Sequence, residues 1–280
     1  MSIENTPFGT HKIAFIGAGN MARSLMGGLI SQGYPPENIS CSDPNEHTLA
    51  MAEELGNIQT SIDNSLVIQS ADFVVLAVKP QLVKDVLYSL KGAFNNNKVI
   101  LISIAAGINC KSLNDWLKED IRIIRCMPNT PALVQSGVCG MYATNDVDIL
   151  EKKLIFNLMS AVGVAIWLDS EEQLDAVTAI SGSGPAYFFL FMEALKNMGQ
   201  ELGLESEMAT ILTQQTALGA AKMAIDSDEE FSELRRKVTS PNGTTHAAIQ
   251  FFENNNFSKT IDGAVKAAYE RSKSLTKEFE

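Results

Sequence analysis

The sequence predicts an α/β protein with a doubly wound sheet at its N-terminus, followed by an all-helical C-terminal domain. In the first half, short runs of β-forming residues alternate with helical stretches. This alternation is typical of a parallel sheet covered by helices on both faces. After about Asp169 the strand signals stop and the pattern becomes helical. We therefore expect one domain over residues 1–169 and a second over residues 170–280.

The expected strands are bounded by Gly, Pro, Asn or Asp, which interrupt regular structure. They are Lys12–Ile16, Ile39–Ser42, Phe73–Val78, Val99–Ile104 and Ile121–Cys126, with Val138–Ala143 and Val164–Leu168 extending the sheet. The expected helices of the first half include Asn20–Gln32, Asn45–Leu55 and Gln81–Leu90. Those of the second half are Pro185–Leu202, Ser206–Ile225, Thr244–Glu253 and Thr260–Glu278.

Composition narrows the class of protein. The chain has 280 residues and a net charge of -11, which argues against a nucleic-acid partner because phosphate backbones require a basic surface. Its apolar runs are too short to cross a membrane. The four cysteines form no C-x-x-C pair and lie near no His at ligand spacing, so no metal site is expected. Free thiols suit a reducing cytoplasm.

A glycine-rich turn follows the first expected strand. Gly17-Ala18-Gly19-Asn20-Met21-Ala22 leads directly into a helix. In this pattern Gly17 permits a tight turn, Gly19 lets the backbone approach a pyrophosphate, and Ala22 permits close helix packing. The pyrophosphate would lie at the helix N-terminus, where unpaired N–H groups favour an anion. Because a βαβ unit follows, the motif predicts a Rossmann-type dinucleotide site.

Asp43 ends the second expected strand, 21 residues beyond Ala22. An acidic side chain at this place can accept hydrogen bonds from the adenosine ribose hydroxyls. The alternative is that Asp43 only opens a turn before Pro44. Between Arg23 and Lys79 there is no Lys or Arg, so this segment lacks the usual cationic partner of a 2′-phosphate.

Further motifs follow later strands and recur in the helical half. Ala77-Val78-Lys79-Pro80, Ser103-Ile104-Ala105-Ala106-Gly107 and Arg125–Pro131 stand where strands end, the edge at which open α/β sheets bind ligands. The helical half contains Asp175–Tyr187 and Val238-Thr239-Ser240-Pro241-Asn242-Gly243-Thr244-Thr245. Together these segments resemble the pyrroline-5-carboxylate reductase family from Ile13 to the final helix. Asn242 stands where many members have Gly, a mild exchange because Asn tolerates a left-handed backbone.

The resemblance implies reduction of the cyclic imine Δ1-pyrroline-5-carboxylate to L-proline, the last step of proline biosynthesis, with NADPH or NADH. It also implies a homodimer through the C-terminal helices, in many members assembled into a decamer of five dimers. The residues expected at the dinucleotide are Ile16, Gly17, Ala18, Gly19, Asn20, Met21, Asn64, Ala77, Val78, Lys79 and Pro80, and Asp43 joins them by its position at the end of the second strand. Those placed towards the nicotinamide are Ala105, Ala106, Met127, Pro128, Asn129 and Thr130. Those that would hold the substrate are Ser240, Gly243, Thr244 and Thr245.

The chemistry of an imine requires few catalytic groups. A protonated imine is already an electrophile, so hydride transfer depends mainly on alignment with the nicotinamide. The Ser240–Thr245 loop opens a helix, and its N–H groups and hydroxyls suit a substrate carboxylate. Thr245 is the expected catalytic residue, through a hydrogen bond to the ring nitrogen or a proton relay from water.

Other interpretations remain open at this stage. The Ser240–Thr245 loop alone would be read as a helix cap, and Pro185 as a residue of a first helical turn. His246 is interpreted as an exposed helix residue. A hydroxyacid dehydrogenase of the same two-domain plan would require a Lys one turn into the helix after Gly184, but the first Lys is Lys196. A non-catalytic NAD(P)-binding protein would leave the Ser240–Thr245 loop without a role.

Overall fold

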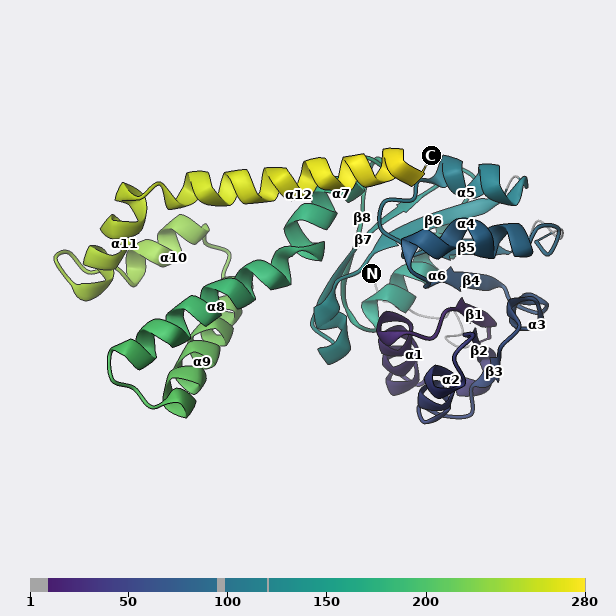
Figure 1. Cartoon of the computed structure of the whole chain (residues 1–280), viewed down its shortest axis with the longest axis horizontal. Helices are drawn as coiled ribbons and strands as arrows, with labels where there is room; N and C mark the ends of the chain where they lie inside the picture. Colours follow the sequence, from purple (N-terminus) through teal and green to yellow (C-terminus); the bar gives the residue numbers. More distant parts are fainter. Residues whose placement is uncertain (1–9, 95–98, 120, 280) are drawn as a thin grey trace. The chain divides into compact units, whose positions relative to one another are not determined.

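The computed structural model describes residues 10–94, 99–119 and 121–279 and divides the chain into two compact units (Figure 1). Unit 1 comprises the chain up to Ser183 together with Ala268–Glu280, and unit 2 comprises Gly184–Ala267. The final helix therefore contributes to both units. The functional domains expected over residues 1–169 and 170–280 stay a prediction.

Unit 1 is built on one sheet of eight strands in the order β3-β2-β1-β4-β5-β6-β7-β8. The strands are β1 (Ile13–Ile16), β2 (Ile39–Ser42), β3 (Gln59–Ser61), β4 (Phe73–Leu76), β5 (Ile100–Ser103), β6 (Arg122–Met127), β7 (Gly137–Ala143) and β8 (Gly163–Trp167). Strands β1 to β6 pair in parallel. The order reverses between β1 and β4, and such a switch point is where doubly wound sheets bind ligands.

Helices lie between most of the strands of unit 1. They are α1 (Asn20–Ser31), η1 (Pro36–Asn38), α2 (Glu46–Glu53), α3 (Asn64–Ile68), α4 (Pro80–Ser89), α5 (Cys110–Leu117), η2 (Thr130–Val134), α6 (Ile149–Ser160), α7 (Gln173–Val177) and the π-helical turn η3 (Thr178–Gly182). Helices α3, α5, α6 and α7 and strand β3 lie outside the ranges named from the sequence. A capping box marks α6, since Asp148 accepts from Glu151 N and Glu151 accepts from Asp148 N.

Both faces of the sheet are covered by helices, which explains why the strands are almost continuously hydrophobic. In β1, Ile13 and Phe15 pack in a core with α1 residues such as Leu25, whereas Ala14 and Ile16 pack in a second core with α4 residues such as Leu87. Successive residues of a strand point to opposite faces, so both faces of β1 must be apolar when helices cover both. The doubly wound architecture expected from the sequence is confirmed.

The last two strands depart from the parallel arrangement. Strand β7 runs antiparallel to β6, with Cys126 opposite Met141, and β8 runs parallel to β7. The connection from β6 to β7 contains only the short helix η2, and a parallel pairing requires a crossover of a dozen or more residues. The short connection therefore accounts for the reversal.

Unit 2 is helical throughout. Its helices are α8 (Gly184–Glu201), α9 (Ser206–Ile225), α10 (Phe231–Lys237), α11 (Thr244–Asn254) and the first part of α12 (Phe257–Phe279). Helices α8 and α9 pack side by side (Figure 1). The rings of Phe191, Phe252 and Phe257 lie within 5.0–6.5 Å of one another. This aromatic cluster joins α8, α11 and the start of α12.

The end of α12 packs within unit 1. Ser272 Oγ donates to Asp175 Oδ1 at 2.6 Å, and Ser272 is buried. Leu275 and Phe279 lie over Gly107, where an added Cβ would come 3.0 Å from Leu275 Cβ. Gly107 also has a φ of +75°, a backbone conformation that favours glycine. The loop after β5 is thus covered by the last turns of α12.

The four cysteines are free and buried. Burial, followed by the charges of Asp43 and Glu53, raises the pKa of Cys41 to about 12, so its thiol stays protonated and unreactive. Among the described residues, no helix is long and apolar enough to span a membrane.

Candidate active site

The glycine-rich turn after β1 is held tightly at the carboxyl edge of the sheet. Gly17 has a φ of +95°, and its N–H donates to Ser42 O at 2.7 Å. A Cβ at Gly17 would come 2.8 Å from Ala77 O. Both the backbone conformation and the close approach of the chain after β4 therefore require glycine at this position.

The N-terminus of α1 is open to an anion. Its N-cap residue is Gly19, which has no side chain, and an added Cβ there would meet nothing within 4 Å. The N–H groups of Asn20, Met21 and Ala22 lack partners within the helix, and the first turn carries no acidic residue. The open backbone fits a dinucleotide pyrophosphate, as the motif predicts.

Asp43 is fixed beside this turn. Its Oδ2 accepts from Ala18 N at 3.1 Å and its Oδ1 from Asn45 N at 3.0 Å. The carboxylate thus orders the glycine-rich turn and also starts the turn before α2, so the two interpretations of Asp43 are compatible. Each oxygen keeps a lone pair for a further donor. The ribose contact itself stays a prediction.

Two other polar residues near this edge are already engaged. The buried Ser42 hydroxyl donates to Asn64 Oδ1 at 2.7 Å, which holds the first side chain of α3 against the end of β2. The guanidinium of Arg23 donates to Asn20 Oδ1 at 2.6 Å and to Met51 Sδ at 2.7 Å. Arg23 therefore lies across α1 and α2 in this structure.

The segments after β4, β5 and β6 end at the same edge. Ala77 N donates to Ile16 O at 2.8 Å, and Lys79 and Pro80 form the N-cap and first residue of α4. Ala105 is buried and Ala106 half-buried after β5, while Pro128 and Asn129 are buried after β6. Parallel pairing of β1, β4, β5 and β6 brings these loops together. The fold thus gathers the expected dinucleotide residues at one edge, although their contacts with a ligand stay predictions.

The expected substrate loop lies in unit 2. Gly243 N donates to Ser240 O at 3.1 Å, which closes a turn before α11. Asn242 within this turn has a φ of +59°, the left-handed conformation that Asn tolerates. Gly243 is the N-cap residue of α11, so no loop hydroxyl takes the capping role. Thr244 and Thr245 are exposed in the first turn of α11.

His246 has a contact that the sequence interpretation missed. Asn242 N donates to His246 Nδ1 at 3.0 Å, and His246 is half-buried. It occupies the third position of α11, where Glu or Gln reaches back to a free N–H in a capping box. Here the imidazole accepts from the N–H of Asn242, which is the residue before the N-cap, instead of from the N–H of the N-cap itself. The spacing of four residues is the signal that could have revealed it.

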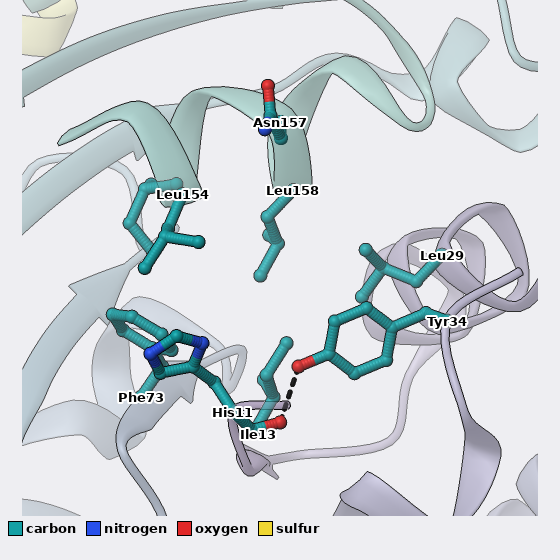
Figure 2. A pocket seen from close by; sticks show the side chains of 9 residues that line it. His11, Ile13, Leu29, Tyr34, Phe73, Leu154, Asn157 and Leu158 are labelled. Carbon is teal, nitrogen blue, oxygen red and sulfur yellow. Dashed lines mark hydrogen bonds between the residues drawn. The ribbon is translucent and has the colours of Figure 1, made fainter. Parts of the chain in front are cut away.

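A small pocket lies at the opposite edge of the sheet (Figure 2). Ile13 and Phe73, the first residues of β1 and β4, line it together with Leu29, Leu154 and Leu158. The Tyr34 hydroxyl donates to the carbonyl of His11. Burial and, secondarily, the charge of Asp72 raise the pKa of Tyr34, so its hydroxyl remains a donor. None of the expected site residues lines this pocket.

Comparison with known proteins gives two family matches. Residues 12–107 match the family model described as NADP oxidoreductase, coenzyme F420-dependent. Residues 171–275 match the family model described as pyrroline-5-carboxylate reductase dimerisation. The first match covers the glycine-rich turn, and the second covers the Ser240–Thr245 loop and the helices around it.

Whole-chain relatives extend these matches. Over 96% of its length the chain is 51% identical to the pyrroline-5-carboxylate reductase of Pseudomonas aeruginosa, of which 98% is covered. A solved pyrroline-5-carboxylate reductase from Coxiella burnetii superimposes with a TM-score of 0.90 at 43% identity, covering 95% of this chain and 99% of that chain. Plasmodium falciparum pyrroline carboxylate reductase, solved with NADP bound, has a TM-score of 0.84 at 31% identity, covering 95% and 98%.

Proposed function

The chain belongs to the pyrroline-5-carboxylate reductase family, and from this premise we propose that it reduces Δ1-pyrroline-5-carboxylate to L-proline with NADPH or NADH. This is the last step of proline biosynthesis. Similarity to reductases along the whole chain favours this reaction over that of a hydroxyacid dehydrogenase. The observation that carries the proposal is the open, uncapped N-terminus of α1 behind Gly17, combined with the Ser240–Thr245 loop of the dimerisation region.

The residues of unit 1 bind and orient the dinucleotide. When bound, the reduced nicotinamide supplies a hydride to the carbon of the C=N bond. The backbone N–H groups at the start of α1 hold the pyrophosphate, and Asp43 accepts from the ribose. The loops containing Ala105, Ala106 and Met127–Thr130 would hold the nicotinamide and keep water from it. Orientation is the main contribution, since a protonated imine needs no strong acid.

The residues of unit 2 hold the substrate. The N–H groups at the uncapped start of α11 bind the substrate carboxylate, because a helix N-terminus favours an anion. Ser240, Gly243 and Thr244 complete this cradle. The hydroxyl of Thr245 hydrogen-bonds the ring nitrogen. Hydride addition to the carbon of the protonated C=N bond moves the π electron pair onto this nitrogen and gives the neutral amine, which then takes up a proton from water. Thr245 therefore aligns the C=N bond for transfer.

The match to the dimerisation region shows that the chain is of a family that forms dimers or larger oligomers. We infer a homodimer through the helices of unit 2, with five such dimers in a decamer. Exposed apolar side chains support the dimer, since Phe188 and Phe189 are 67% and 64% exposed in the single chain. A cytoplasmic location is supported by four cysteines that form no disulfide.

The function is tested by a substrate and cofactor panel. Purified protein is mixed with NADH or NADPH, and oxidation of the dinucleotide is followed with pyrroline-5-carboxylate or its six-membered piperideine analogue. Oxidation that depends on the five-membered imine and yields L-proline supports the proposal. Faster turnover of the six-membered analogue would show that the piperideine, and not pyrroline-5-carboxylate, is the preferred substrate. Dinucleotide binding without turnover of either imine would leave a non-catalytic binding protein.

A further inference from the structure

Asn129 occupies a buried position in the loop after β6. The residue is 8% exposed and has an extended backbone, with a φ of -126° and a ψ of 167°. Its carbonyl accepts from Ala132 N at 3.1 Å and so starts the short helix η2. A buried amide must find partners for both its donor and its acceptor.

Both ends of the Asn129 amide are used within unit 1. Its Nδ2 donates to Ser181 O at 3.1 Å, and its Oδ1 accepts from Val138 N at 2.9 Å. The partners determine the orientation of the amide, because a flipped amide would face a carbonyl with oxygen and an N–H with nitrogen. One side chain therefore joins the loop after β6, the start of β7 and the turn η3.

The carbonyl of Ser181 lies where a regular α-helix would leave it without a donor. In an α-helix this carbonyl would accept from the residue four positions later, which is Pro185. Proline has no N–H. In this segment the helix also widens into a π-helical turn, in which Ser183 N donates to Thr178 O at 2.8 Å. Asn129 Nδ2 supplies the donor that Pro185 cannot.

A second contact supports the same juxtaposition. An added Cβ on Gly182 would come 2.7 Å from Met127 Cε, so the loop after β6 packs directly on the turn η3. On the neighbouring strand, a Cβ at Gly140 would come 2.8 Å from Val177 Cγ2. Close packing of the turn η3 on the loop, and of α7 on β7, thus accompanies the hydrogen bonds of Asn129.

We propose that Asn129 is a positioning residue, which holds the Met127–Thr130 loop against the turn η3 so that the nicotinamide lies correctly for hydride transfer. The inference rests on the proposed function, which places this loop beside the nicotinamide. It assigns the Asn129 side chain a role within the protein, because a backbone group of unit 1 already holds each end of its amide.

Two substitutions separate the two hydrogen bonds. Asn129→Asp keeps an acceptor for Val138 N but places a carboxylate oxygen where the amide nitrogen lies 3.1 Å from Ser181 O. Asn129→Ala removes both bonds. We expect kcat to fall on the order of tenfold to a hundredfold in each variant, because small misplacements of reacting groups cost this much. The dissociation constant for NADH, measured by fluorescence, is expected to change less than about threefold, since the pyrophosphate site is intact.

The deuterium isotope effect with 4-deuterated NADH gives a readout that stability alone does not move. We expect it to change in both Asn129 variants, because hydride transfer itself is affected. Asp148→Ala is the matched control, since it removes the capping box of α6 at the other edge of the sheet. It should lower the melting temperature by about 2–4 °C and leave kcat and the isotope effect unchanged.

Three results would overturn the proposal. If the Asn129 variants behave like Asp148→Ala, with a lower melting temperature but normal kcat and isotope effect, Asn129 is only structural. If NADH binding weakens more than about tenfold while kcat is retained, the side chain is a direct ligand. If Asn129→Ala does not fold, Asn129→Asp decides by the same two criteria. Failure of the wild-type protein to reduce the imine would instead remove the proposed function.

Discussion

The two units of this chain bury their apolar residues to different degrees. In unit 1 the strands are buried on both faces, and side chains such as Phe15 and Leu25 are fully enclosed. In unit 2 the buried residues are Gly184, Ala209 and Thr213, while Phe188, Phe189 and Leu190 are each more than 60% exposed. Large exposed apolar patches mark interaction surfaces. Unit 1 therefore contains its own core, whereas unit 2 resembles half of a core that a second chain completes.

The largest effect is expected from a substitution in the exposed apolar surface of unit 2. Phe189→Asp should barely alter the fold of a single chain, since exposed substitutions cost within about 0.5 kcal/mol. In a symmetric dimer both copies are changed, and a central aromatic contributes about 2–4 kcal/mol. We expect association to weaken at least about a thousandfold and activity to disappear with it. Sedimentation and activity at matched concentrations measure both.

Ile149→Asp is the matched control for this prediction. Ile149 is 83% exposed in unit 1 and begins α6, where an acidic residue is favourable. This variant should remain an active oligomer. An active, stable monomer of either variant at low concentration would contradict the view that unit 2 requires a partner.

The next effect concerns the chemistry expected in unit 2. Thr245→Ala should reduce kcat and kcat/KM together, because the contact with the imine nitrogen is made in the transition state. A hydrogen bond to a charged group contributes about 1.5–3 kcal/mol, so a loss of roughly tenfold to over a hundredfold is expected. Thr245→Ser should retain much of the activity, and NADH binding should stay the same. Normal turnover by Thr245→Ala would contradict the catalytic role of Thr245 and leave the loop only the binding of the substrate carboxylate.

For unit 1, two glycine substitutions test the binding of the dinucleotide. Gly17→Ala places a Cβ 2.8 Å from Ala77 O at a φ of +95°, which distorts the dinucleotide turn. We expect KM for NADH to rise on the order of tenfold. Gly33 has a similar φ of +89° but open space around it. Gly33→Ala should therefore cost only about 1–2 kcal/mol of stability with an unchanged KM. Equal kinetic effects of the two substitutions would show that strain alone is responsible.

The smallest effect is on cofactor preference. We expect wild-type protein to use NADH at least comparably to NADPH, because the carboxylate of Asp43 would face a 2′-phosphate. Two charges 4 Å apart in water-like surroundings interact by about 1 kcal/mol, so Asp43→Ser should improve the use of NADPH over NADH about fivefold. Asp43→Asn also removes the charge; it keeps one acceptor, for Ala18 N, and loses the one for Asn45 N. A hundredfold wild-type preference for NADPH would refute the argument.

The predictability of the site differs between these regions for physical reasons. Gly17 and Gly19 were identifiable because a glycine-rich turn between a strand and a helix is a local pattern. The contact of His246 with Asn242 is also local and was missed only because His is not a usual capping-box residue. Asn129 was expected at the cofactor, but its partners Val138 and Ser181 lie 9 and 52 residues away. No local pattern carries such information.

Sequence alone determined most strands of the sheet, the glycine-rich turn after β1 and the helical character of the second half. These features depend on short-range periodicity and on the conformations that glycine and proline permit. Strand β2 and helix α9 have the expected bounds for this reason. Only the tertiary structure decided the reversed direction of β7, the π-helical turn η3 and the amide bridge from Asn129. The pairing of β7 with β6 and the amide bridge depend on which distant backbone groups meet when the sheet is packed, and the turn η3 lies where that bridge reaches Ser181.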